Sequence, residues 1–178
     1  MNKMLIVAFA LVLAGCAGSK LANRFASKEI QVDYDRFKDV TTLQTFPPIE
    51  IDTGFLTDLE LTAFFKCSGQ RILRPERLGL GFSSSSQNGF RYGQSSELIF
   101  IADGHRISLG TVLYSGSRDP VLTTIVNEVM AVEISVADFE RLAKASTVEA
   151  RLGSTEFRLT IDQRILFKML CDKYLSTR

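Results

Sequence analysis

The chain has 178 residues, of which 46% are hydrophobic and 23% are charged, with 21 basic and 20 acidic side chains. This length fits a single domain with at most a short appendage. The balanced charge argues against a nucleic-acid-binding protein, which normally carries a basic excess, and the high hydrophobic fraction argues against a disordered chain. The only long apolar run lies at the N-terminus, which excludes a protein with several membrane-spanning helices.

The first sixteen residues, MNKMLIVAFALVLAGC, have the three parts of a secretory signal peptide. Lys3 supplies a positive charge, and residues 4–13 form an apolar segment of ten residues. This segment is about half as long as a membrane-spanning helix, so it suits a signal peptide better than a membrane helix. It ends in Leu13-Ala14-Gly15-Cys16, small residues followed by a thiol. One alternative is an ordinary signal peptide in which Cys16 is incidental.

The Leu-Ala-Gly-Cys sequence resembles the lipobox of bacterial lipoproteins, and this resemblance covers only the first sixteen residues. It implies that residues 1–15 are removed and that Cys16 receives fatty acyl chains, such as palmitate, on its sulfur and on its new amino group. Two or three such chains hold a protein durably in a membrane, whereas one chain holds it only marginally. In enterobacterial lipoproteins, an Asp directly after the acylated Cys retains the protein in the inner membrane. This chain has Ala17 at that position, so the resemblance is compatible with delivery to the bacterial outer membrane, facing the periplasm.

Residues 16–29 are expected to form the lipidated anchor and a short tether, followed by a single globular domain over residues 30–178. Most residues of the tether are small or polar, and its charged residues are of both signs. As a flexible coil, its thirteen residues after Cys16 span about 20 Å on average, and at most roughly 45 Å when extended. The domain is therefore expected to lie close to its membrane.

From Ile30 onward the apolar residues alternate with a period of two, which is typical of half-exposed strands. A Thr-rich stretch around Val40 and Leu43 is expected to pair back on the first strand, and Pro47-Pro48 to break any ladder after it. The alternation predicts strands over residues 30–34, 59–67 and 78–82, and an apolar, β-rich run predicts another over residues 97–102.

The clearest turn signal is Asp103-Gly104, which lies between two strand patterns. The type I′ turn of a tight hairpin needs positive φ at both central positions, and Asp-Gly supplies it. Residues 105–114 are therefore expected to return beside residues 97–102. Residues 121–134 form another long strand pattern, and Gly153-Ser154 is expected to turn a second hairpin.

Two helices are expected in the C-terminal third. Ser135, followed by Asp138, is expected to cap a helix that ends near Ala145, and Asp162 to cap a last helix with one apolar stripe. With seven to nine short strands, these elements predict a mainly β (α+β) fold. The expected architecture is an antiparallel β-sandwich or an open barrel, with the two helices covering an edge or an end.

The two remaining cysteines, Cys67 and Cys171, would lie in an oxidising compartment if the chain is exported. A disulfide between them would close a loop of roughly 105 residues and stabilise the fold by about 4.7 kcal/mol. The alternative is two separately buried thiols, because free Cys is among the most buried residue types. Both positions lie in apolar periodic faces, which allows either arrangement.

Few residues of this chain are suited to catalysis. His105 is the only histidine, and no clustered Cys and His have the spacing of zinc ligands, so we expect no catalytic residue, no metal and no cofactor. Glu128 and Glu133 lie within an apolar strand, and Glu128 is in register to project into a core or a pocket. A raised pKa there would make Glu128 a site candidate. A salt-bridged or exposed position is the alternative.

Residues 83–96, SSSSQNGFRYGQSS, are the one unusual segment, with six serines and two glycines around Phe90, Arg91 and Tyr92. Small polar residues give an adaptable backbone, while Tyr, Phe and Arg are contact types enriched at binding hot spots. The functional hypothesis is a binding loop that presents these three side chains. The alternative is a connection whose aromatic rings fold back on the sheet.

Together these features predict a membrane-anchored bacterial envelope lipoprotein that acts as a non-enzymatic binding, scaffold or assembly component. Its expected partners are the membrane, through acylated Cys16, and other envelope proteins, but not nucleic acid. Two alternatives remain: a small periplasm-facing hydrolase that uses acidic residues inside the sandwich, and a lipoprotein that binds a lipid or another apolar ligand.

Overall fold

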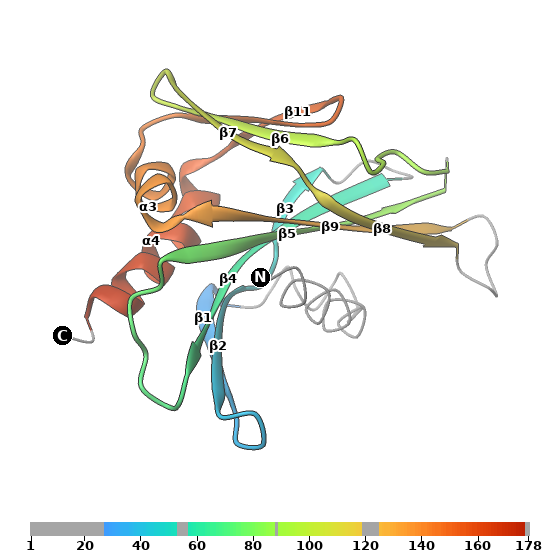
Figure 1. Ribbon diagram of the computed structural model, residues 1–178. Coiled ribbons are helices and arrows are strands. Elements are labelled where there is room, and N and C mark those ends of the chain that lie inside the picture. Colours follow the sequence, from blue (N-terminus) through green and yellow to red (C-terminus); the bar gives the residue numbers. More distant parts are fainter. Residues whose placement is uncertain (1–26, 53–56, 88, 119–124, 177–178) are drawn as a thin grey trace.

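The computed structural model describes residues 27–52, 57–87, 89–118 and 125–176, which form eleven strands and two helices (Figure 1). The mainly β fold with two helices near the C-terminus, predicted from the sequence, is confirmed. The elements are β1 (Glu29–Asp35), β2 (Val40–Phe46), β3 (Ile49–Asp52), β4 (Thr57–Ser68), β5 (Arg77–Ser86), β6 (Glu97–Ala102), β7 (His105–Thr111), β8 (Leu113–Arg118), β9 (Val126–Ser135), α3 (Val136–Lys144), β10 (Val148–Leu152), β11 (Thr155–Leu159) and α4 (Ile161–Leu175).

The strands form two antiparallel sheets. The larger sheet has the order β1-β2-β4-β5-β9-β8, with β3 also paired to β4, and the smaller sheet has the order β11-β10-β6-β7. The smaller sheet lies over one part of the larger sheet, while α3 and α4 lie over another (Figure 1). The described strands do not close into a barrel. Two antiparallel sheets that cover one another are consistent with the predicted β-sandwich.

The core lies between the larger sheet and the elements that cover it. The period-two pattern places one side of β4 and β5 in this core, where Leu61, Leu80 and Phe82 are fully buried. Ring contacts then join the layers. They are Phe82 with Phe157 at 6.3 Å between the sheets, Phe65 with Tyr174 at 5.7 Å between β4 and α4, and Phe139 with Phe167 at 4.9 Å between the helices.

The Asp-Gly hairpin is confirmed. Asp103 and Gly104 have φ values of 47° and 83°, as a type I′ turn requires, and they join β6 to β7. The Asp103 carboxylate also accepts hydrogen bonds from the Ser146 N–H at 2.9 Å and the Thr147 N–H at 2.7 Å. These bonds lower the pKa of Asp103 and fasten the hairpin to the connection between α3 and β10.

The lowered pKa predicts a pH-dependent effect of Asp103→Asn, a substitution that keeps a residue tolerant of positive φ. A carboxyl group with a depressed pKa stabilises the fold above its unfolded-state pKa of about 4, and this contribution is lost as pH falls through the lower, folded-state value. We therefore expect the variant to melt below the wild type at neutral pH, with the difference disappearing in acid. Melting temperatures measured across this range would contradict the prediction if the difference were independent of pH.

The serine run is part of a strand rather than a loop. Residues 83–86 continue β5 and pair with both β4 and β9, and Ser84 and Ser86 are buried on the inner face. The predicted loop over residues 83–96 therefore begins only at residue 87, because central pairing on both sides holds even a chain of serines in the strand conformation.

One further strand prediction needs correction. The single strand predicted over residues 105–114 is two strands in different sheets: after Gly110, with a φ of 74°, Val112 donates its N–H to the Ser96 carbonyl at 2.9 Å, and β8 then joins the larger sheet. The predicted break at Pro47-Pro48 is confirmed, since β2 ends at Phe46, but the short strand β3 that follows and pairs with β4 was not predicted. Residues 119–124, at the start of the predicted strand 121–134, lie outside the described part.

Both predicted helices are present, but one cap differs, and Ile165 of the predicted apolar stripe is 41% exposed. Ser135 caps α3 by accepting from the Asp138 N–H, and the helix ends at the cap residue Ala145. The cap of α4 is Thr160 rather than Asp162, which lies in the first turn. Thr160 is the favoured cap because it forms a reciprocal capping box with Gln163. The two side chains accept hydrogen bonds from the backbone N–H groups of both residues.

Candidate functional site

The carboxylate of Glu128 is the central polar group between the two sheets. Glu128 lies on the inner face of β9 and is only 1% exposed. Its Oε2 accepts a hydrogen bond from the Arg91 N–H at 2.8 Å, and its Oε1 accepts from the Tyr92 N–H at 2.9 Å and the Tyr114 hydroxyl at 3.0 Å. Hydrogen bonds to an ionised acceptor are the strong ones. Glu128 therefore fastens the connection between β5 and β6 to the sheet.

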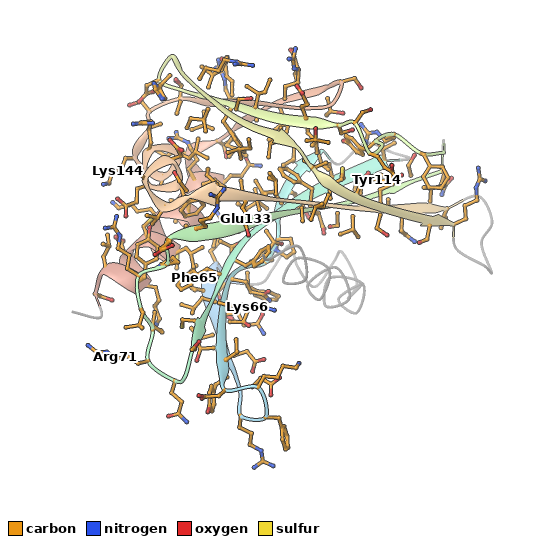
Figure 2. The ribbon with its side chains drawn as sticks, viewed as in Figure 1. Phe65, Lys66, Arg71, Tyr114, Glu133 and Lys144 are labelled. Carbon is orange, nitrogen blue, oxygen red and sulfur yellow. The ribbon has the colours of Figure 1, made fainter. Side chains whose placement is uncertain are left out.

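Tyr114 and Gly116 on β8 complete this arrangement. Tyr114 lies at the end of the larger sheet that is far from the helices (Figure 2). Burial and the neighbouring Glu128 carboxylate raise the pKa of Tyr114 to about 12. Gly116 lies directly opposite Glu128 in the register. A Cβ atom there would lie 2.4 Å from the Tyr114 hydroxyl and 2.8 Å from Cε1 of Phe90, so the absence of a side chain at residue 116 lets both rings pack.

Of the three residues predicted to form a binding loop, one is clearly presented to solvent. Phe90 is 49% exposed, and the guanidinium of Arg118 lies 5.6 Å from its ring centroid. Arg91 is half-buried, with its guanidinium 5.6 Å from the Tyr92 ring.

Tyr92 corrects the binding-loop hypothesis, because it is only 8% exposed. Its hydroxyl donates to Thr155 Oγ1 at 3.2 Å, and its N–H is bonded to Glu128. This residue folds back into the core and is not available to a partner. The surface that remains at this end of the molecule is formed by Phe90 and Arg118, with Arg91 beside it.

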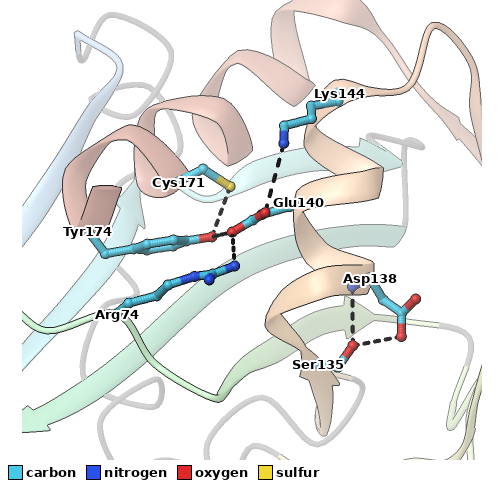
Figure 3. Close-up of polar contacts among 7 residues, drawn as sticks. All are labelled: Arg74, Ser135, Asp138, Glu140, Lys144, Cys171 and Tyr174. Carbon is cyan, nitrogen blue, oxygen red and sulfur yellow. Dashed lines mark hydrogen bonds and ion pairs between the residues drawn. The ribbon is translucent and has the colours of Figure 1, made fainter. Parts of the chain in front are cut away.

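A second polar cluster joins the two helices to the chain before β5 (Figure 3). Glu140 on α3 accepts from Arg74 at 2.8 Å and from the Tyr174 hydroxyl at 3.3 Å, and its second oxygen lies 3.8 Å from Lys144 Nζ. The Tyr174 hydroxyl also lies 3.3 Å from Cys171 Sγ. Burial is the main cause that raises the pKa of both Tyr174 and Cys171. A raised pKa disfavours the reactive thiolate form of Cys171.

Cys67 and Cys171 are separate free thiols rather than the disulfide considered from the sequence. Cys67 on β4 is half-buried, and its Sγ lies 3.8 Å from the Thr41 carbonyl and 3.5 Å from the Arg71 carbonyl. Cys171 lies on the buried face of α4, with its Sγ 3.3 Å from the Tyr174 hydroxyl. Each sulfur atom therefore contacts polar atoms of its own surroundings rather than the other cysteine.

This difference in burial predicts different reactivity of the two thiols. We expect iodoacetamide to alkylate Cys67 in the native protein at least tenfold faster than Cys171, since reaction requires an accessible thiolate. Peptide mass mapping after a native labelling pulse measures both rates, and labelling in urea provides the control in which both react. Recovery of a Cys67–Cys171 crosslinked peptide without reductant, or equal native rates, would contradict the prediction.

The remaining sequence candidates do not converge on a site. His105 is exposed at the start of β7, next to the Asp103 turn. Glu133 lies on the outer face of β9 and pairs with Arg77 at 2.9 Å. Within the described ranges, no three His, Cys, Asp or Glu side chains are grouped so that they could hold a metal ion.

Comparison of the chain with protein-family models, with curated proteins and with solved structures finds no match. In the described part of the chain, no helix has the length and hydrophobicity needed to cross a membrane. The function is therefore inferred from the residues of this chain alone.

Proposed function

We propose that this protein is a bacterial envelope lipoprotein, anchored to the outer membrane through acylated Cys16 and facing the periplasm. The observation that carries the proposal is the sequence of residues 1–16, in which a basic start, a short apolar segment and Leu-Ala-Gly-Cys follow one another. Residues 4–13 are too short to span a bilayer as a helix, so a lipidated cysteine supplies the lasting attachment.

The folded domain begins close to this anchor. Strand β1 starts at Glu29, which leaves twelve residues, 17–28, between the acylated cysteine and the first strand. Extended, they reach at most roughly 40 Å. The tether therefore supports a role at the membrane surface, and Ala17 supports delivery to the outer membrane.

Within the envelope, we propose a non-enzymatic binding or scaffold role, with Phe90 and Arg118 as the contact surface for another envelope protein. A half-exposed aromatic ring next to a guanidinium is a contact type enriched at protein interfaces. Glu128 supports this role because it holds the chain beside Phe90 rigid, which lowers the entropic cost of binding.

The hydrogen bonds that Glu128 accepts do not favour the hydrolase alternative. A general acid or base needs a lone pair or a proton directed at a substrate, whereas both oxygens of this carboxylate accept hydrogen bonds from the protein. The Phe82–Phe157 contact between the sheets similarly gives no support to an apolar ligand at that point of the core.

Metabolic labelling with an alkyne fatty acid tests the proposal. The wild type and the matched cysteine variant Cys67→Ser are expected to incorporate label and to co-fractionate with outer-membrane vesicles. Cys16→Ser is expected to incorporate none and to retain residues 1–15, because processing follows acylation. Equal label in Cys16→Ser and the wild type would overturn the proposal.

A further inference from the structure

The turn between β1 and β2 carries the most exposed large apolar side chain among the described residues, Phe37, which is 86% exposed. The two strands contact α4, while the turn end of the hairpin points away from the smaller sheet and the helices (Figure 1). The Arg36 guanidinium lies 4.7 Å from the Phe37 ring centroid, and the Lys38 side chain is 79% exposed. An exposed ring between two basic side chains combines the two interactions that hold protein segments at the surface of an anionic bilayer.

Internal hydrogen bonds hold this turn in shape. Asp35 Oδ1 accepts from the Phe37 N–H at 3.0 Å and the Lys38 N–H at 3.2 Å, and Asp35 Oδ2 lies 3.0 Å from Lys38 Nζ. Asp39, with a φ of 50°, accepts from the Tyr34 hydroxyl at 2.8 Å. Both carboxylates are thus bonded within the hairpin, and the turn presents Phe37 without having to be ordered on contact.

The connection between β4 and β5 adds a further basic side chain at the same end. Gly69 donates its N–H to the Asp39 carbonyl at 2.8 Å, which fixes this connection beside the hairpin. Arg71, two residues later, is exposed and lies at this end of the molecule (Figure 2). Asp35 and Asp39 lie at the same end, but their carboxylates are bonded within the hairpin. Each basic residue near an anionic lipid surface adds to the attraction, so Arg36, Lys38 and Arg71 are the side chains that would contact headgroup phosphates.

The tether allows the hairpin turn and the acyl anchor to meet the same membrane. Strand β1 leads from Glu29 to the turn over seven residues, a length of about 23 Å. The twelve residues between Cys16 and Glu29 span up to roughly 40 Å, which exceeds that length. An anchored chain therefore keeps the turn at a high effective concentration next to the bilayer, where even a weak contact is populated.

We propose that the Arg36-Phe37-Lys38 turn is a second membrane contact, in which Phe37 inserts among the headgroups of an anionic phospholipid bilayer while Arg36 and Lys38 bind phosphates. The proposal rests on the acyl anchor proposed above, which supplies the proximity. It gives the domain a fixed orientation on the membrane, with the hairpin turn against the lipid.

The chain contains no tryptophan, so single substitutions place a unique fluorophore at chosen sites. Phe37→Trp, and Phe90→Trp as a matched control at another exposed phenylalanine, are made in the full acylated chain. The protein is reconstituted in vesicles of phosphatidylethanolamine and phosphatidylglycerol that contain nitroxide-labelled lipid. Flotation of the vesicles reports the anchor, and quenching of the emission reports the contact of the turn with lipid.

We expect the indole emission of Phe37→Trp to shift to the blue and to lose most of its intensity, while the emission of Phe90→Trp is unchanged. Adding Arg36→Ser and Lys38→Ser to the Phe37→Trp chain is expected to restore part of the lost intensity. Floating Phe37→Trp protein with unquenched emission would overturn this inference and leave the anchor intact.

Protein that does not float would instead refute the anchor. In that case the same variants are attached to chelator-lipid vesicles through an N-terminal histidine tag, which supplies the proximity in place of the acyl chains. Unquenched emission of the attached Phe37→Trp protein also overturns the inference.

Discussion

Replacing Glu128 with alanine is expected to lower the free energy of unfolding by about 4 kcal/mol, a large fraction of the stability of a single domain. The substitution takes the carboxylate acceptor from the N–H groups of Arg91 and Tyr92 and from the Tyr114 hydroxyl. A buried donor left without a partner costs about 1–3 kcal/mol. Urea unfolding followed by far-ultraviolet circular dichroism measures the loss.

Two glutamine variants on β9 test whether the loss of stability comes from the hydrogen bonds of Glu128 or only from the loss of a negative charge. Glu128→Gln keeps the volume but turns an amide donor toward other donors, and is expected to cost about 2 kcal/mol. Glu133→Gln breaks only the exposed pair with Arg77 and is expected to cost less than about 1 kcal/mol. Equal unfolding midpoints for the two variants would show that Glu128 does not anchor the connection.

Gly79→Ala is expected to destabilise the protein by about 2 kcal/mol, because the Phe64 ring occupies the place of the missing side chain. The two residues are direct partners across β4 and β5, and a Cβ on Gly79 would lie 2.1 Å from Cζ of Phe64. Phe64 is buried, so moving its ring aside exposes apolar surface to water. The unfolding midpoint in urea measures the cost.

Gly93→Ala is the matched control for this substitution. A Cβ on Gly93 meets no atom within 4 Å, so a change within about 0.5 kcal/mol is expected. In a double-mutant cycle, Phe64→Ala removes the ring that collides with the new methyl group, so Gly79→Ala should then cost little. Additive effects of the two substitutions would contradict the packing of Phe64 on Gly79.

The parts of the fold that the sequence predicted are those determined by local residues. The alternation of apolar residues predicted the positions of β1 and β4, and the Asp103-Gly104 turn depends on two residues that tolerate positive φ. The first helix was predictable because the Ser135 hydroxyl accepts from the Asp138 N–H in the first turn of that helix. Each of these features is determined within a few residues of the chain.

The parts that could not be predicted depend on residues far apart in the sequence. The register of Glu128 with Val126 and Met130 on one strand face indicated possible burial, but its partners Arg91 and Tyr92 lie 37 and 36 residues away. Likewise, residues 83–86 look like a loop by composition, and only pairing with β4 and β9 makes them a central strand. Tertiary pairing overrides weak strand propensity in such cases.

The most direct test of the lipoprotein assignment is the mass of the N-terminal peptide of the mature protein, isolated from bacterial membranes after proteolysis. The assignment predicts a peptide that begins at Cys16, lacks residues 1–15 and is heavier than its sequence by two or three fatty acyl chains. A peptide that begins elsewhere, or one that contains Cys16 with an unmodified thiol and amino group, would contradict it.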